Sequence, residues 1–426
     1  MHLTHLELKN FRGASSFALD FDPRLNVLVG MNGAGKSSVL DAVAIMLSWI
    51  TNRIKSPRGS GRPIVETDIQ NTKHYAGITL TCCLGDFSGQ SWRLVKSRKG
   101  HLETEMRTSL NLVSQIAREF QESITASQAK VNLPLLAYYP VNRAVLDIPL
   151  RIRAKHSFDL LDTYDGSLTS GANFRTFFEW YREREDLENE NRRYIDQASK
   201  PEDFQFPDPQ LEAVRKAIGM LLPEFTNLSV RRKPLRMEVE KSGQRLTINQ
   251  LSGGEKCQLA LVGDLARRFA IANPIRKNPL EGEGIVLIDE IDLHLHPKWQ
   301  RTVVPKLMEI FPNCQFLIST HSPSIISHVR PKSLFLLRSS PSNIEVVRPG
   351  QSYGKNVDRI LEDIMGLETT RPDAVKRDLE DIYQLIEQGE FENAKTRISV
   401  LETKIGEDPD LVKAGVLIRR KVLLGQ

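Results

Sequence analysis

The chain has 426 residues, enough for two or three domains, and its 40% apolar and 26% charged residues are typical of a folded globular protein. The net charge of +5 permits contact with nucleic acid without indicating it. The four cysteines have no metal-ligand spacing, and no apolar run reaches the length of a membrane span or a signal segment. These features exclude a disulfide-stapled secreted domain and a membrane protein, so we expect a cytoplasmic protein with no membrane partner.

The first part of the chain predicts strands that lead into a glycine-rich loop. Residues 2–11 and 15–21 alternate apolar and polar side chains, as half-buried antiparallel strands do. A buried strand is expected at 25–30, followed by the loop and by a helix from Lys36. The basic stretch 51–61 is rich in Gly, Ser and Pro, which predicts a mobile loop.

The next part predicts a return to strands. Strands are expected at 77–85, 91–97 and 101–107, then a helix at 110–124 and a buried strand at 133–141.

A largely helical region is expected from 144 to 225. Its densest charge run, residues 174–195, has no long heptad series, so a short helical arm is favoured over a coiled coil. Beyond it, a short strand-like segment precedes "LSGGE" and a helix from Lys256. Two further buried strands, 284–290 and 314–320, flank a helix that begins at Pro297.

The end of the chain predicts helices. Apolar residues fall on one face of each of two segments joined by an "EQGE" turn, which predicts an αα-hairpin. They are Val375, Leu379, Ile382 and Ile386 in the first segment, and Phe391, Ala394, Ile398, Leu401 and Ile405 in the second. "DPD" at 408–410 is expected to cap a further helix.

The strongest chemical motif is "GMNGAGKS", Gly30 to Ser37, which fits the phosphate-binding loop G-x-x-x-x-G-K-[ST]. The glycines let backbone N–H groups surround a β-phosphate, Lys36 neutralises phosphate charge, and the Ser37 hydroxyl suits Mg²⁺. An apolar strand precedes the motif and an amphipathic helix follows it. The motif therefore predicts nucleotide binding.

Two acids end the buried strand "GIVLIDE". In a doubly wound sheet an acid at this end of a strand lies beside the phosphate loop. We expect Asp289 to hold Mg²⁺, through water, and Glu290 to polarise the attacking water as a general base. The alternative is an Asp-Glu pair that merely begins a loop.

Histidines provide two weaker signals. His321, at the tip of "LISTHSP", is a candidate donor to a γ-phosphate, although a lone histidine is more often a turn residue. "HLHP", His294 to Pro297, could suggest a metal site, but no third ligand has suitable spacing. A loop at a subunit contact is the favoured interpretation.

The order "GMNGAGKS", "LSGGEK", "LIDE", "STHS" resembles the ATP-binding-cassette (ABC) ATPases, and "LSGGE" is their signature. The lead "LELKNFRGASSFALDF" resembles the SMC, RecF and OLD group. The resemblance implies an α/β ABC-type head: a P-loop mixed sheet with an antiparallel β-subdomain, a helical insertion and a C-terminal helical hairpin.

The resemblance also implies a head-to-tail dimer that sandwiches two ATP molecules with Mg²⁺. It places Lys36 and Ser37 on phosphate and metal, Asp289 and Glu290 on metal and water, and His321 on the γ-phosphate. Nucleotide contacts in cis would come from Gly30, Asn32, Gly33, Ala34, Gly35, Lys36, Ser37, Ser38 and Arg12. Contacts in trans, from the second subunit, would come from Ser252, Gly253, Gly254 and Glu255, with Asp292 in the loop that crosses the dimer contact.

One family feature is not recognisable. No clear Q-loop glutamine follows a strand between the two glycine motifs, and Asn142 of "AYYPVNR" stands where it would be expected.

Within the group, the stretch between Lys36 and Ser252 is too short for SMC coiled coils, and the residues after Ser340 show no nuclease centre of the OLD type. The chain resembles the Septu anti-phage ATPases, PtuA, above all in "YYPVNR", "FFEWYREREDLENE" and the helical tail. That resemblance implies a separate HNH nuclease partner of the PtuB type, docked on the tail hairpin or on the helical insertion. A hairpin that only packs on the ATPase core is the alternative.

Two other functions stay open. A RecF- or SMC-like ATPase that repairs or clamps DNA would need basic runs such as "RRFA" with "IRK", or "VRRKPLR", to contact duplex DNA. A nucleotide-gated scaffold would bind ATP with little turnover. The expected domains are an N-terminal ATPase lobe (1–143), a helical insertion (144–225), a C-terminal ATPase lobe (226–345) and a helical region for partner docking (346–426). Assemblies larger than a dimer are also open.

Overall fold

The computed structural model describes residues 1–85, 87–101, 106–141, 158–169, 173–195, 204–340 and 343–424. The middle of the strand expected at 101–107, the Q-loop position Asn142 and the start of the expected helical insertion lie outside these ranges. Within them, no helix is long and apolar enough to cross a membrane.

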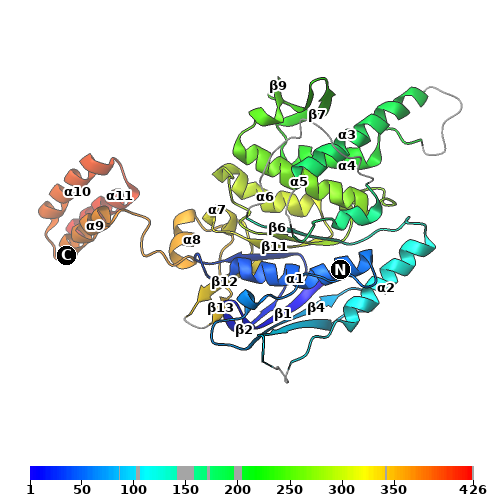
Figure 1. Ribbon diagram of the computed structural model, residues 1–426. Coiled ribbons are helices and arrows are strands. Elements are labelled where there is room, and N and C mark those ends of the chain that lie inside the picture. The colour runs from blue at the N-terminus through cyan, green and yellow to red at the C-terminus, as the bar shows by residue number, and fades with distance from the viewer. Residues whose placement is uncertain are drawn as a thin grey trace. The chain divides into compact units, whose positions relative to one another are not determined.

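A six-stranded sheet forms the centre of the fold, in the order β13-β12-β3-β11-β10-β6 (Figure 1). Five of these strands run parallel to one another, namely β3, β6, β10, β11 and β12, and β13 pairs antiparallel with β12. Their bounds are β3 Leu25–Val29, β6 Leu135–Tyr139, β10 Gly284–Ile288, β11 Cys314–Ser319, β12 Leu334–Ser339 and β13 Ile344–Val347. Strands β3, β6, β10 and β11 are buried along their whole length, which explains their continuous apolar runs.

A four-stranded antiparallel sheet, β2-β1-β4-β5, forms a second layer. Its strands are β1 His2–Phe11, β2 Ala14–Asp20, β4 Tyr75–Cys83 and β5 Gln90–Ser97. Helix α1 (Lys36–Lys55) lies between the two sheets, and α2 (Asn111–Ala126) packs beside it (Figure 1).

The prediction of a mobile loop at 51–61 is wrong for its first half, because residues 51–55 continue α1. The chain then folds back onto the helix. The indole N–H of Trp49 donates to the carbonyl oxygen of Arg62 at 3.0 Å. A Cβ on Gly61 would lie only 2.4 Å from the Trp49 ring, so the glycine permits this close return.

Helices cover the other face of the central sheet (Figure 1). They are α3 Phe174–Asn191, α4 Pro209–Leu221, α5 Gly253–Ala272 and α6 Pro297–Ile310. A small sheet adjoins them, made of β7 Phe225–Arg232, β8 Leu235–Lys241 and β9 Gln244–Thr247. Helix α5 is buried over most of its length, and its Gly263 lets the ring of Phe177 on α3 pack against the backbone.

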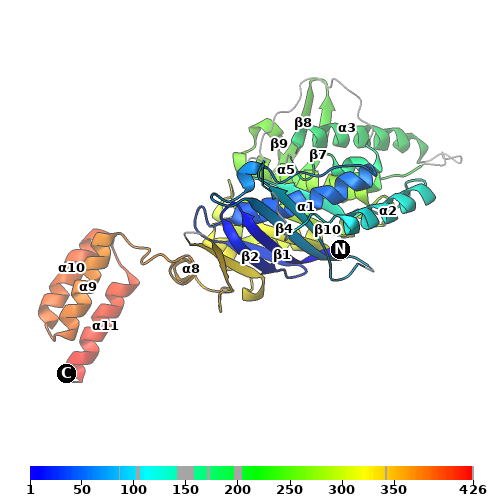
Figure 2. The same cartoon turned by 60° about the horizontal axis from the view of Figure 1, so that its bottom comes forward.

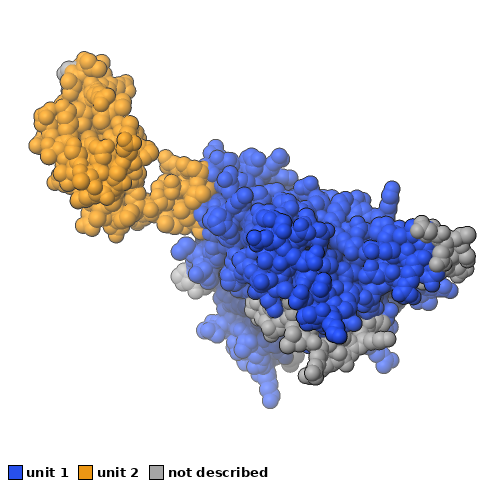
Figure 3. Space-filling view, turned by 90° about the horizontal axis from the view of Figure 1, so that it is seen from above, with its two compact units in different colours: residues 1–355 blue, residues 356–426 orange. Residues whose placement is uncertain are grey.

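The described residues form two compact units, Met1–Lys355 and Asn356–Gln426, coloured separately in Figure 3. The smaller unit contains α8 Val357–Asp363, α9 Asp373–Glu387, α10 Phe391–Ile405 and α11 Pro409–Leu423. Helices α9 and α10 form the expected hairpin, and α11 packs beside both (Figure 2). As expected, the side chain of Asp408 caps α11, accepting the N–H of Asp410; Arg371 also pairs with Asp408, at 2.9 Å.

Candidate functional site

The phosphate loop connects β3 to α1 at the carboxyl end of the central sheet. Its geometry requires glycine at two positions. Gly35 has φ of 95°, and a Cβ there would lie 2.2 Å from Cδ1 of Ile344 on β13. A Cβ on Gly30 would lie 2.4 Å from the carbonyl oxygen of Leu337 on β12. Strands β12 and β13, neither of which the sequence predicted, therefore form the back of this loop.

Lys36 is the first residue of α1 and is almost fully buried. Its ammonium donates to the carbonyl oxygens of Gly30 at 2.9 Å and Met31 at 3.1 Å. Burial lowers the pKa of Lys36 below its ordinary value, although the nearby carboxylates of Asp289 and Glu290 act to raise it. Next to it, Ser37 is exposed at the first turn of the helix, as are Asn32 and Gly33 in the loop.

The two acids lie at the same edge of the sheet because β10 and β3 both pair with β11. The hydroxyl of Ser319, the last residue of β11, connects them. It donates to the carboxylate of Asp289 and accepts the backbone N–H of Glu290 at 2.7 Å. Glu290 has φ of 46°, a left-handed conformation that is uncommon for a residue other than glycine. Ser319 therefore fixes both the Asp289 side chain and the strained backbone of Glu290.

His321 follows on the neighbouring strand end, and Asp292 fixes its backbone. The Asp292 carboxylate accepts the hydroxyl of Thr320 and the N–H of His321, the latter at 3.3 Å. The loop after β10 and the loop after β11 are thus joined at a second point. The structure brings Lys36, Asp289, Glu290 and His321 to one edge of the sheet.

The signature residues form a separate cluster at the start of α5. Ser252 is the N-cap residue, and its side chain accepts the N–H of Glu255. The Glu255 carboxylate accepts both the N–H and the hydroxyl of Ser252, at 2.8 and 2.7 Å, in a reciprocal capping box. Burial acts to raise the pKa of Glu255, but its hydrogen bonds with Lys241 and Ser252 hold it below its ordinary value.

The cluster borders a hollow of about 660 Å³ that is lined by Ser252, Gly254, Glu255, His294, Lys298 and Trp299 among others. A Cβ on Gly254 would lie 2.4 Å from the carbonyl oxygen of His294, so the glycine lets the loop after β10 reach the start of α5. The Nδ1 atom of His296 accepts the N–H of Lys298 at 3.2 Å, which gives this histidine a role as the N-cap of α6.

Arg12 lies in a different polar cluster from the signature. It has φ of 50°, its Nε donates to Asp68 at 2.8 Å, and its guanidinium pairs with Asp41 on α1. Arg62 pairs with the same Asp41 at 2.7 Å. Burial acts to lower the pKa of Arg12, but Asp41 and Asp68 raise it above its ordinary value.

The sequence profile of the RecF/RecN/SMC N terminal domain matches residues 2–340, well over half of the chain. The chain belongs to this family.

Three relatives of this RecF/RecN/SMC-family chain match over most of its length. The Retron Vc95 probable ATPase of Vibrio cholerae is 32% identical over 415 residues, covering 83% of this chain and 79% of that protein. The Retron Ec83 probable ATPase of Escherichia coli is 30% identical, with 80% and 72% covered. Septu protein PtuA of Bacillus thuringiensis is 25% identical, with 87% and 85% covered. The resemblance to the Septu ATPases expected from the sequence is confirmed.

Among solved structures, the SMC head bound to the C-winged helix domain of ScpA covers 82% of this chain and 98% of its own, with 17% identity and a TM-score of 0.44. An SMC head domain from Thermotoga maritima covers 82% of this chain and 100% of its own, with a TM-score of 0.40.

The residues at the sheet edge fit a magnesium–nucleotide complex in their chemistry. Mg²⁺ prefers oxygen ligands, and proteins commonly bind it through one or two side chains together with substrate phosphates. Ser37 and Asp289 would supply a hydroxyl and a carboxylate. In the described ranges, no group of three or more His, Cys, Asp and Glu side chains is placed to hold a metal ion without such a ligand.

Sequence reasoning missed the residues that hold this site together. Ser319 and Thr320 lie at the end of the strand expected at 314–320 and drew no prediction of their own, whereas each bridges β11 to the loop after β10. Asp41 and Arg62 carried no sequence signal at all, because they meet only when α1 and the chain beyond it fold back on each other.

Proposed function

We propose that this RecF/RecN/SMC-family chain is an ATP-hydrolysing subunit of an anti-phage defence complex, in which two copies close head to tail around two ATP molecules and regulate a separate HNH nuclease. The observation that carries the proposal is the arrangement at the sheet edge. There, Ser319 positions Asp289 and Glu290 at the strand ends. Beside them lies the phosphate loop, in which Lys36 donates to the carbonyl oxygen of Gly30.

Each residue at this edge has a distinct role in the proposal. Lys36 exchanges its hydrogen bonds to the carbonyl oxygens of Gly30 and Met31 for stronger bonds to phosphate oxygens. These bonds offset the desolvation free energy of the buried ammonium. Ser37 and Asp289 would hold Mg²⁺, and the bound ion would supply positive charge beside the phosphates. Glu290 accepts a proton from the attacking water, and His321 donates a hydrogen bond to the γ-phosphate.

The signature acts on the ATP of the second copy in this proposal. Ser252 lines an open hollow, and the helix that it caps directs its N-terminal dipole there. Its own contacts are with Glu255, and through Glu255 with Lys241, rather than with the edge that holds Lys36. A γ-phosphate brought by a second copy would complete this half-site.

A defence ATPase is supported by the relatives, namely a Septu protein and two probable ATPases of retrons. Control of a separate nuclease is the further step of the proposal. The C-terminal unit, with its own hydrophobic core, is the candidate docking surface for the nuclease. Co-expression with the neighbouring open reading frame tests this directly. We expect co-purification of an HNH protein and loss of phage restriction in Lys36→Ala. A chain that purifies alone, with restriction intact in Lys36→Ala, would contradict the proposal.

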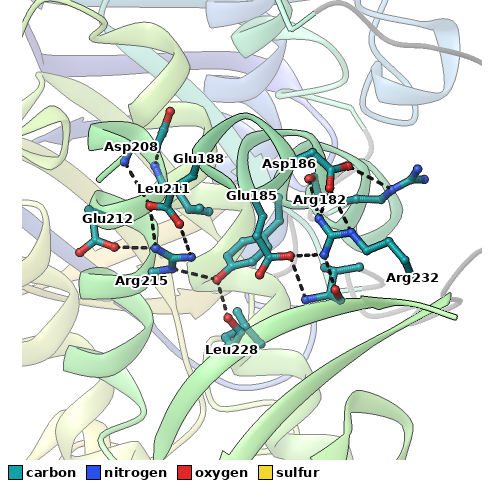
Figure 4. A network of polar contacts seen from close by, with 12 residues as sticks. Arg182, Glu185, Asp186, Glu188, Asp208, Leu211, Glu212, Arg215, Leu228 and Arg232 are labelled. Atoms are coloured by element: carbon teal, nitrogen blue, oxygen red, sulfur yellow. Dashed lines mark hydrogen bonds and ion pairs between the residues drawn. The ribbon is translucent and has the colours of Figure 1, made fainter. Parts of the chain in front are cut away.

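The DNA-clamping alternative is less well supported by the described side chains. Arg267 and Arg268 of "RRFA" are each only 2% exposed, so they are not available to a duplex. In "VRRKPLR", Arg232 pairs with Glu185 and Asp186 (Figure 4). Arg236 of the same run pairs with Glu238.

Comparing turnover of the wild type with Glu290→Gln separates an ATPase from a scaffold that binds ATP without hydrolysing it.

A further inference from the structure

A cluster of buried polar side chains lies in the second half of α5, which we call the signature helix because the signature forms its start. Asp264 is fully buried, and its carboxylate accepts hydrogen bonds from three side chains. Arg267 donates at 2.7 Å, Arg268 at 2.8 Å and the hydroxyl of Tyr139 at 3.0 Å. We call these four residues the α5 polar cluster.

The cluster connects α5 to both parts of the ATP-binding edge. Tyr139 is the last residue of β6, and its carbonyl oxygen accepts the N–H of Asp289 at 2.9 Å. Arg268 donates to the carbonyl oxygens of Thr163 and Asp165, at 2.6 and 3.0 Å. The Asp165 carboxylate pairs with Lys55, the last residue of the helix that Lys36 begins. One set of contacts thus extends from the signature helix to the strand end that carries Asp289 and to α1.

Stability alone is a weak explanation for such a cluster. Burying charges carries a large desolvation cost, and buried ion pairs can often be replaced by apolar residues without loss of stability. What buried charges joined by hydrogen bonds do provide is a defined geometry, because a displacement leaves a charge unpaired. Here that geometry is the position of α5 relative to β6.

We propose that Tyr139 and Asp264 are positioning residues for ATP hydrolysis, which hold the signature helix in register with the strand end that carries Asp289. This rests on the proposed function, since the signature matters for hydrolysis only if it meets the ATP of a second copy. Closure of the second copy on Ser252 pushes on α5, and the cluster carries that displacement to Tyr139 and so to the backbone at Asp289.

The test is Tyr139→Phe, compared with Tyr164→Phe as a matched control. Tyr164 is also buried, and its hydroxyl donates one hydrogen bond, to the carbonyl oxygen of Pro134 at 2.8 Å, outside the cluster. Both variants should lower Tm, Tyr139→Phe by somewhat more, because its hydroxyl bonds to a carboxylate and that of Tyr164 to a neutral carbonyl oxygen. We expect kcat for ATP to fall by about tenfold in Tyr139→Phe only, the factor expected for one lost hydrogen bond to a charged group. The KM for ATP should stay within about twofold, because the phosphate loop is unchanged.

A double mutant identifies the partner through which Tyr139 acts. Adding Tyr139→Phe to Asp264→Asn should cause no further loss of kcat, because the two residues act as one unit. The inference is overturned if Tyr139→Phe keeps the wild-type kcat, or if Tyr164→Phe loses as much. A wild-type chain that does not hydrolyse ATP would instead overturn the proposed function, and the inference with it.

Discussion

The ammonium of Lys36 donates to the carbonyl oxygen of Gly30, six residues earlier and 2.9 Å away. The cation of the phosphate loop is thus held by the backbone of its own loop. Carbonyl oxygens are weaker partners for an ammonium than phosphate oxygens, and the side chain is buried. The loop is therefore arranged so that a phosphate would relieve an unfavourable burial.

Replacing Lys36 by Met should abolish ATP binding and stabilise the nucleotide-free chain. Burial lowers the pKa of Lys36, so the folded state binds its proton less tightly than the unfolded state. The cost is present at neutral pH and is relieved only as pH rises through the lowered pKa toward the unfolded value. We expect the Tm of Lys36→Met at pH 7 to rise by about 1–3 °C, a trade of stability for function. A Tm below that of the wild type would contradict this account of Lys36.

Removing the hydroxyl of Ser319 should impair hydrolysis more than binding. Without it, the Asp289 carboxylate and the Glu290 N–H each lose a buried partner. We expect kcat of Ser319→Ala to fall by about tenfold or more while the Kd for ATP changes little. Ser352→Ala is the matched control, because that fully buried hydroxyl donates to the carbonyl oxygen of Val329. Equal kcat values for the two variants would show that the Ser319 hydroxyl has no specific role in hydrolysis.

The pairing of Lys241 with Glu255 should be visible in the pH dependence of stability. Hydrogen bonds with Lys241 and Ser252 keep the folded-state pKa of Glu255 low despite its burial. Its contribution is therefore present above the unfolded pKa and is lost as pH falls through the folded value. In Lys241→Ala that loss should begin at higher pH, within the range of about pH 3 to 5 where glutamate titrates. Parallel Tm curves for variant and wild type would show that the pair does not perturb Glu255.

The C-terminal unit should respond to a core substitution separately from the ATP site. Ile382 on α9 is fully buried among apolar side chains of α10 and α11. Ile382→Ala should destabilise this unit by about 2–4 kcal/mol. Val400→Ala, at a half-exposed position on α10, should change it by less than about 0.5 kcal/mol. Peptide-resolved hydrogen exchange over residues 373–423 measures both, and an ATP Kd altered by Ile382→Ala would show that the two units do not respond independently.

Much of the site could be predicted from the sequence because its motifs end strands whose apolar runs are unambiguous. Strands β3, β10 and β11 are buried throughout, and a parallel sheet necessarily brings their carboxyl ends together. Strands β12 and β13 were missed, although they back the phosphate loop at Leu337 and Ile344. The α5 polar cluster could not be predicted either: Arg267 and Arg268 look like a solvated basic run, and only the fold places Asp264 and Tyr139 against them.

Mixing two inactive variants tests the central claim, that each ATP is shared between two copies. Lys36→Ala retains the signature and Ser252→Arg retains the phosphate loop, so each variant alone should hydrolyse no ATP. In an equal mixture, half of the dimers contain both variants, and each of these has one intact composite site. The account predicts recovery of about a quarter of wild-type turnover, if the copies exchange freely and the two sites act independently. A mixture as inactive as either variant alone, with mixed dimers shown to form, would contradict the account.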